Sequence, residues 1–360
     1  MAKKAIKSKR TGARPDFDNI EIESQVCQLL CAGKGVSEIV EILGSANVPI
    51  SLTRQQPYKF LQVAAERGRL RYQPLVSFEL SHRLKSHFEW LTKLDVVHAT
   101  TSEAIAERAA ENLLGLICGK RKSKRPDEYH LGFAGGGLLQ MTARRLAEKI
   151  ARTSMPLPKR IVFHAMVGRF GENPATDPNS FVGYFTSEPL PIEIRFVGLM
   201  APGLVSSKTM RQLRTMEGTC EAFKRANEID VIVTSAGGHW KKGCSQLFGQ
   251  YQERRDHAAL NALKDANCIG DLMWRPLGAK GPIELETGIR ATTLVELSQL
   301  PDLIAKQTSV MLVLGPCVTC GEPKLEMMNA ILHLEPHLIT DLVCDSLTAR
   351  VFATAFLAKA

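Results

Sequence analysis

Three consecutive glycines in the middle of the chain have the clearest potential for binding chemistry. Gly135, Gly136 and Gly137 follow the short apolar stretch that begins at Leu131, and a helical pattern starts at Leu138. Backbone N–H groups of such a turn can approach an anion, because no side chain separates them from it. The turn matches neither a Walker A loop nor a dinucleotide fingerprint. A tight connection and a ligand cradle therefore both remain open interpretations.

A second group of residues could read a nucleic acid. The group consists of Thr53, Arg54, Gln55, Gln56, Tyr58 and Lys59. Arg can form two hydrogen bonds with guanine, and Gln can form two with adenine. They stand at the start of a helix predicted over about 53–67, with Thr53 or Ser51 as its N-cap and Pro57 in its first turn. The alternative is a small helical dimerisation or regulatory domain with a polar outer face.

Cysteines and histidines give weaker signals. Cys317 and Cys320 form a C-x-x-C pair with no second pair nearby in the sequence. Two ligands cannot complete a structural zinc site, so we expect neither a metal nor a cofactor. His164, His239 and His257 are candidate acid-base residues, but isolated histidines are more often structural. The sequence shows no convergent acid and base, and we therefore expect no enzymatic activity.

The elements that must position these residues fall into two regions. Apolar residues recur at helical spacing over 20–30 and 36–43, upstream of the helix at 53–67. A polar and apolar alternation at 69–72 predicts a strand or wing after the third helix. Together these elements predict a winged helix-turn-helix over 16–75, preceded by a flexible basic arm at 1–15.

The rest of the chain, 76–360, alternates strands with helices. Short β-branched runs at 129–134, 160–164, 192–197, 229–234 and 310–314 predict strands, and helical patterns separate them. This alternation predicts an α/β domain with a mostly parallel sheet, whose ligands bind beyond the carboxyl ends of the strands. Glycine-containing turns at 235–239 and 314–317 also follow predicted strands. Several strand ends are therefore expected to converge on one pocket.

Charge and composition narrow the function classes. The 360 residues carry 46 Lys plus Arg against 37 Asp plus Glu, and residues 1–85 hold 14 and 8 of these. The basic excess at one end favours a polyanion-binding module. Nine scattered cysteines and no apolar run long enough to span a membrane predict a cytoplasmic protein.

From about Ile20 onward, the order of motifs resembles the SorC family of bacterial sugar-binding transcriptional regulators. The resemblance rests on Ala65–Arg71, Leu131–Gly137, Leu199–Gly203 and Cys268–Leu272, and on the ending formed by Leu338–Asp341 with Leu347–Ala349. It implies a helix-turn-helix domain fused to a sugar-binding and oligomerisation domain. That domain is similar to the sugar isomerase, deaminase and CoA-transferase fold.

The resemblance also implies a function and a set of site residues. A sugar or sugar phosphate would modulate binding of a dimer or tetramer to a double-stranded DNA operator. The implied effector-binding residues are Gly135, Gly136, Gly137, Arg169, Asp271, Lys324 and Asp341. Ala134 stands where the family commonly has a hydroxyl, which leaves an unphosphorylated sugar or a lost ligand open. Two alternatives are a sugar-phosphate isomerase or deaminase with a fused N-terminal domain, and an oligomerisation scaffold without a ligand.

Overall fold

A computed structural model of the chain divides it into two compact units, Met1–Gln73 and Pro74–Ala360. The structure describes residues 16–45, 50–67, 75–99, 101–119, 125, 127–169, 174–187, 189–238, 244–285, 290–317 and 319–357. The predicted arm at 1–15 and the predicted wing at 69–72 lie outside the described residues, as does His239.

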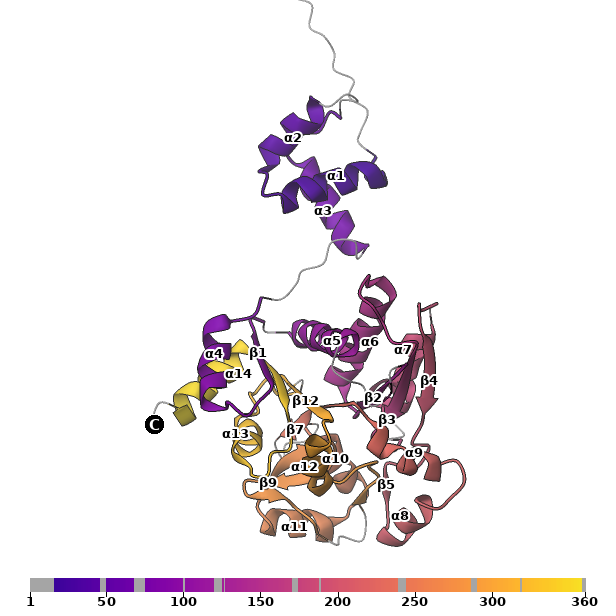
Figure 1. Cartoon of the computed structure of the whole chain (residues 1–360). Helices are drawn as coiled ribbons and strands as arrows, with labels where there is room; N and C mark the ends of the chain where they lie inside the picture. Colours follow the sequence, from indigo (N-terminus) through magenta and orange to yellow (C-terminus); the bar gives the residue numbers. More distant parts are fainter. Residues whose placement is uncertain are drawn as a thin grey trace, which may run out of the picture. The chain divides into compact units, whose positions relative to one another are not determined.

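The small unit has three helices around one apolar cluster (Figure 1). They are α1 (Ile20–Cys31), α2 (Val36–Gly44) and α3 (Gln56–Glu66). The side chain of Asn19 accepts hydrogen bonds from the N–H groups of Glu21 and Ile22 and so begins α1. The buried side chains of the cluster are Val26, Ile39, Leu43, Leu52 and Phe60. The helical periodicity of the sequence thus predicted the three helices and their apolar faces.

The start of α3 differs from the sequence prediction. The helix begins at Gln56, so Thr53, Arg54 and Gln55 lie in the turn before it, and no side chain caps its first position. Instead, the side-chain oxygen of Gln56 accepts a hydrogen bond from the Thr53 N–H at 2.6 Å. The expectation that Thr53 or Ser51 caps the helix through its hydroxyl was therefore wrong.

The large unit is built on a seven-stranded sheet in which every neighbouring pair is parallel. In spatial order the strands are β1 (Lys93–Val97), β13 (Asp341–Asp345), β12 (Ser309–Leu314), β6 (Val231–Thr234), β2 (Glu128–Phe133), β3 (Arg160–Ala165) and β4 (Glu193–Val197). The predicted parallel α/β domain is confirmed. Apart from the edge strand β4, most residues of these strands are buried, and most of those are apolar, as expected for a sheet covered on both faces.

Eleven helices among the described residues accompany the strands of this unit. They are α4 (Phe78–His87), α5 (Ser102–Cys118), α6 (Gly137–Arg152), α7 (Pro178–Thr186), α8 (Ser207–Leu213), α9 (Cys220–Lys224), α10 (Gln246–Glu253), α11 (His257–Asp265), α12 (Leu300–Ala305), α13 (Leu325–His333) and α14 (Ser346–Phe352). None of the described helices is long and apolar enough to cross a membrane.

Short strands and single turns complete the unit. An antiparallel sheet contains β10 (Gly281–Pro282), β9 (Arg275–Gly278), β8 (Cys268–Leu272) and β7 (Ala236–Gly238), and β11 (Arg290–Ala291) pairs with β5 (Leu204–Val205). The single turns are Pro174–Thr176, Ala226–Glu228, Leu297–Gln299 and Ala353–Leu357. The antiparallel sheet, which the sequence did not predict, carries Asp271.

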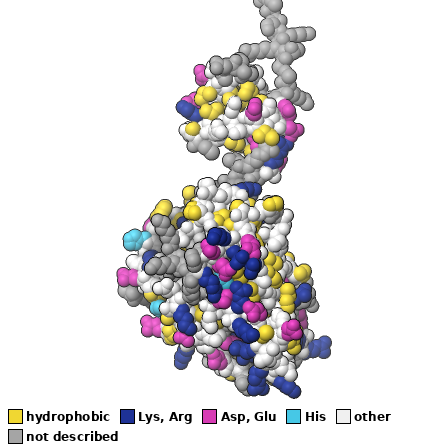
Figure 2. Space-filling model, turned by 45° about the vertical axis from the view of Figure 1, so that its right-hand side comes forward, with side chains coloured by type: hydrophobic (Ala, Val, Ile, Leu, Met, Phe, Trp, Pro, Cys, Tyr) yellow, Lys and Arg dark blue, Asp and Glu magenta, His cyan; other side chains and the backbone are white. Residues whose placement is uncertain are grey.

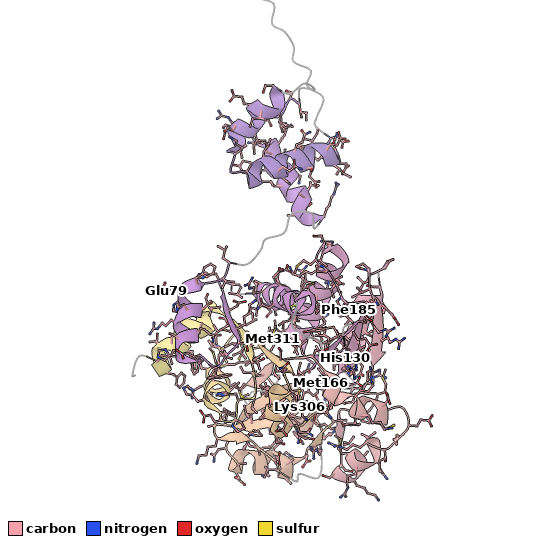
Figure 3. All side chains as sticks on the ribbon, viewed as in Figure 1. Glu79, His130, Met166, Phe185, Lys306 and Met311 are labelled. Atoms are coloured by element: carbon pink, nitrogen blue, oxygen red, sulfur yellow. The ribbon has the colours of Figure 1, made fainter. Side chains whose placement is uncertain are left out.

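Packing fixes the helices against the sheet. α5 packs on α6, and α6 packs on α7, so these three form a continuous layer (Figure 1). Phe133 of β2 stacks on Phe163 of β3 with ring centroids 5.2 Å apart, and Phe181 of α7 meets Phe133 edge-on at 6.1 Å. Phe185, labelled in Figure 3, extends this aromatic cluster toward Phe163. The cluster holds the start of α7 close to the carboxyl end of β2.

Candidate functional site

An open pocket lies beyond the carboxyl ends of β2, β6 and β12. Gly135–Leu138, Ser235 and Pro316 line it from these three strand ends, and Ser102 lines it from the start of α5. The cavity volume is about 150 Å³, and the pocket is open to solvent at its mouth. The predicted convergence of glycine-lined strand ends at one pocket is thus seen in the structure.

The glycine turn forms one wall of the pocket. Gly136 has a φ of +126°, which a residue with a side chain rarely adopts, and Gly137 begins the 16-residue helix α6. A Cβ on Gly137 would meet no atom within 4 Å, so this position faces open space. The first N–H groups of a helix have no acceptor within it. The start of α6 therefore offers N–H donors and the positive end of the helix dipole to a ligand.

A buried acid and a lysine form the opposite wall. Asp271 of β8 accepts a hydrogen bond from the Ser245 hydroxyl at 2.7 Å, and the Lys324 ammonium donates to the Ala236 carbonyl at 2.6 Å. Burial raises the pKa of Asp271 and lowers that of Lys324, and the attraction between the two groups opposes both shifts. A Cβ on Gly237 would lie 2.0 Å from Asp271 Oδ2, so only glycine lets β7 approach the carboxylate this closely.

Five of the seven sequence-predicted effector residues line this pocket. They are Gly135, Gly136, Gly137, Asp271 and Lys324. Arg169 does not line it: its side chain is mostly exposed, with Nε 3.5 Å from Asp177 Oδ2. Asp341 is the first residue of β13 and therefore lies at the opposite end of the sheet, where it accepts a hydrogen bond from the Thr340 hydroxyl. We accordingly leave Arg169 and Asp341 out of the candidate pocket.

A third cysteine joins the C-x-x-C pair. The sulfur atoms of Cys244, Cys317 and Cys320 all lie within 4.8 Å of one another, and Cys244 and Cys317 line the pocket. The sequence shows no second cysteine pair near Cys317 and Cys320, but folding brings the single Cys244, just before α10, beside the turn after β12. Gln246 and Trp274 are further lining residues that sequence reasoning did not identify.

The candidate acid-base histidines that the structure describes lie away from the pocket. His257 is exposed at the start of α11. His164 of β3 is buried, and its Nε2 lies 2.9 Å from Nδ1 of His130 on β2, which is labelled in Figure 3. Burial, together with the neighbouring His130 and arginines, lowers the pKa of His164 to about 3. His164 is therefore neutral at physiological pH and serves the packing of β2 against β3.

The His164 environment predicts acid sensitivity of the large unit. Its pKa is lower in the folded chain than in the unfolded one, so its contribution to stability is complete above about pH 6.5 and is lost as the pH falls toward 3. Stability should fall by up to about 1.4 kcal/mol per pH unit below that point. Urea unfolding of wild type and of His164→Asn between pH 7 and pH 5 should show a shallower decline for the variant. The exposed His257→Asn is the control and should decline as wild type does.

On the small unit, the residues around the start of α3 form a polar surface. Thr53, Arg54, Gln55 and Lys59 are exposed, and Tyr58 is 62% exposed, whereas Pro57 and Phe60 face the core. Gln56 is half-buried and bonded to the Thr53 backbone, which occupies its side chain. The structure thus brings five of the six predicted DNA-reading residues to one exposed surface.

Basic and acidic side chains are mixed on the face of the large unit turned forward in Figure 2.

Comparison with solved structures identifies the fold. The full-length sorbitol operon regulator SorC from Klebsiella pneumoniae has a TM-score of 0.62 at 17% identity, over 93% of this chain and 99% of that one. A DeoR family transcriptional regulator from Listeria monocytogenes has a TM-score of 0.53 at 17% identity, over 76% of this chain and 98% of that one. A transcriptional regulator from Streptococcus pneumoniae has a TM-score of 0.57 at 16% identity, over 77% and 96%.

Sequence comparisons add no further relatives. No protein-family model matches the chain, and no curated protein matches it. The structural similarity nevertheless extends over most of the chain. The match to the sorbitol operon regulator covers 93% of the chain, which is more than the large unit contains by itself. The chain therefore has the fold of the SorC and DeoR transcriptional regulators, as the sequence resemblance predicted.

Proposed function

We propose that this protein is a DNA-binding transcriptional regulator whose affinity for its operator changes when a sugar or sugar phosphate binds the large unit. The observation that carries the proposal is the fold of a full-length operon regulator over 93% of the chain. In this proposal the units form a helix-turn-helix domain at 16–75 and an effector domain at 76–360, and the protein has no enzymatic activity.

The surface at the start of α3 supports the DNA-binding part. In a helix-turn-helix the first residues of the recognition helix reach base edges in the major groove. Arg54, Gln55, Tyr58 and Lys59 are exposed in this position, and the buried Phe60 anchors the helix to the small unit. One such helix reads few base pairs, so we propose a dimer or tetramer that reads paired half-sites.

The pocket supports the effector part. A phosphate or hydroxyl group can bind the N–H donors at the start of α6, while the hydroxyls of Ser102 and Ser235 and the Asp271 carboxylate are suited to sugar hydroxyls. An effector that prefers one of two arrangements of the chain must change DNA affinity reciprocally. No histidine is among the described residues that line the pocket, which favours binding over acid-base turnover.

Selection of genomic fragments by the full-length protein tests the proposal. The selection is carried out with and without a panel of sugars and sugar phosphates, and the operator affinity of the recovered site is then measured. We expect one palindromic site and at least one compound that changes its affinity by about 5- to 150-fold. Enrichment of no site would refute the regulator, and turnover of a panel compound would favour the isomerase or deaminase alternative.

Gly137→Gln separates effector binding from DNA binding. Because a Cβ there meets open space, the glutamine side chain should enter the pocket without disturbing the fold. We expect the variant to bind the operator as wild type does but to lose the response to the effector. Gly115→Gln, which adds the same side chain to an exposed position of α5 with equal room, is the matched control. A full effector response in Gly137→Gln would show that the effector binds elsewhere.

A further inference from the structure

Three thiols meet beside the pocket from two separate parts of the chain. Cys244 immediately precedes α10, and Cys317 and Cys320 lie in the turn between β12 and α13. All three sulfur atoms lie within 4.8 Å of one another. Cys244 and Cys317 are buried, with exposed fractions of 9% and 4%, and Cys320 is half-buried. Among the described His, Cys, Asp and Glu side chains, these three lie close enough together to bind one metal ion.

The turn after β12 arranges two of the thiols for metal binding. The Cys317 N–H donates to the Glu322 carbonyl at 2.9 Å, and the Gly321 N–H donates to the Cys317 carbonyl at 2.7 Å. These bonds fold the backbone around Cys317, whose sulfur accepts hydrogen bonds from the N–H groups of Cys320 and Thr319. Backbone donors directed at a sulfur stabilise its thiolate form, which is the form that binds a metal.

The electrostatics differ among the thiols. Burial opposes ionisation of Cys317, but hydrogen bonds from the Cys320 and Thr319 N–H groups hold its pKa below the ordinary value. Burial raises the pKa of Cys244 to about 12, so without a metal this thiol keeps its proton. Hydrogen bonds thus favour ionisation of Cys317, whereas burial disfavours ionisation of Cys244.

Lys324 supplies a nearby positive charge. Its ammonium group interacts with all three thiols and with Asp271, and these interactions raise its pKa against the effect of burial. Three thiolates and a divalent ion together carry one negative charge, which would lie beside the Lys324 ammonium group. The attraction between this ammonium group and the metal-bound thiolates would lower the cost of burying them.

We propose that Cys244, Cys317 and Cys320 bind one thiophilic metal ion, Zn²⁺ being the representative, as three thiolate ligands with the fourth coordination position open to the pocket. Zinc–sulfur bonds of about 2.3 Å in a tetrahedral site place the sulfurs about 3.8 Å apart, so a small contraction suffices. Binding forms three metal–sulfur bonds and releases the remaining thiol protons to solvent. Water or a ligand oxygen would occupy the fourth position, as in zinc sites that have three protein ligands.

This site is independent of the proposed regulation, because it requires neither DNA nor a sugar. The competing explanations are close packing of three apolar thiols and oxidation of two of them to a disulfide. Packing predicts no affinity for metal ions, and a disulfide leaves too few thiolates to bind one.

Cobalt titration of the full-length, untagged and fully reduced chain tests the proposal. Co²⁺ bound by thiolates absorbs strongly in the near ultraviolet through charge transfer from sulfur. We expect this band to saturate at one Co²⁺ per chain, to disappear when Zn²⁺ displaces the cobalt, and to be accompanied by proton release. An intensity that corresponds to three sulfur ligands is expected.

Variants identify the ligands. Cys317→Ser should abolish the one-equivalent band, and Cys320→Ser, at a half-buried position that tolerates substitution more easily, should weaken binding while the chain stays folded. Cys220→Ser, at the start of α9 and outside the cluster, is the matched control and should titrate as wild type does. Absence of the band in wild-type protein whose thiols are shown to be reduced would overturn the proposal. So would a band that persists unchanged in both cluster variants.

Discussion

Replacing Arg54 and Gln55 together with alanine is expected to remove most of the preference for the operator over random DNA. Each well-formed bidentate contact to a base is worth about 1–3 kcal/mol, so two additive losses amount to about 2–6 kcal/mol. Both side chains are exposed in the turn before α3, and neither belongs to the buried cluster of the small unit. The loss should therefore appear in DNA affinity and not in the thermal stability of the protein.

Titration of operator and random DNA at one salt concentration measures this effect. Gln28→Ala with Lys34→Ala is the matched control, because it removes an amide and one positive charge outside α3, from the exposed Gln28 and the half-buried Lys34. The control should keep its specificity. Equal specificity of wild type and of the Arg54 and Gln55 variant would mean that another surface reads the DNA.

The sequence predicted the large features of the fold because they depend on local periodicity. The helical spacing of Val26 and Leu30, and the β-branched runs at 160–164 and 310–314, are properties of short segments. The sequence does not predict the strand β13, because Leu338–Asp341 is interpreted there as a motif of the resemblance and not as the approach to a strand. Asp341 is the first residue of β13 and therefore lies at the amino end of the strand. Ligands of a parallel sheet bind beyond the carboxyl ends of the strands, so Asp341 is not an effector-binding candidate.

The pocket was predictable only in part. Glycine turns after strands mark the carboxyl edge of a sheet, and this rule correctly brought Gly135–Gly137 and Ser235 to one place. The contact between Asp271 and Ser245, and the approach of Cys244 to Cys317, depend on how the antiparallel sheet folds back over that edge. No spacing in the sequence encodes those contacts. They arise from tertiary packing, which is why the third cysteine was missed.

Charge in the small unit is distributed differently from what the count over residues 1–85 indicates. The described residues from 16 to 67 contain four Lys and Arg against seven Asp and Glu, so these residues are acidic overall. The six basic residues of the sequence before Pro15 have no acidic neighbours there. Arg69 and Arg71 follow these residues in the sequence. We infer that the segment 1–14 supplies much of the attraction to the DNA backbone, whereas α3 supplies the selectivity.

Removal of residues 1–14 is therefore expected to weaken binding to every DNA sequence alike. Each phosphate contact contributes about 0.9 to the slope of log affinity against log salt, so loss of six contacts would lower that slope by up to about five. The ratio of operator to random affinity should stay constant, since phosphate contacts carry no sequence information. Affinities for both DNAs over a range of salt concentrations measure slope and ratio together.

A second variant distinguishes charge from chain length in this segment. It keeps residues 1–14 but replaces all six of their basic side chains with glutamine, and it should reproduce the shallow salt dependence of the deletion. The response to the effector should be the same in both variants as in wild type, because the pocket is formed wholly by residues of the large unit. An unchanged salt slope in both would assign the phosphate contacts to the rest of the small unit, despite the acidic balance of its described residues. Arg54, Lys59 and Arg67 would then be the basic residues to replace next, since they lie on or beside α3.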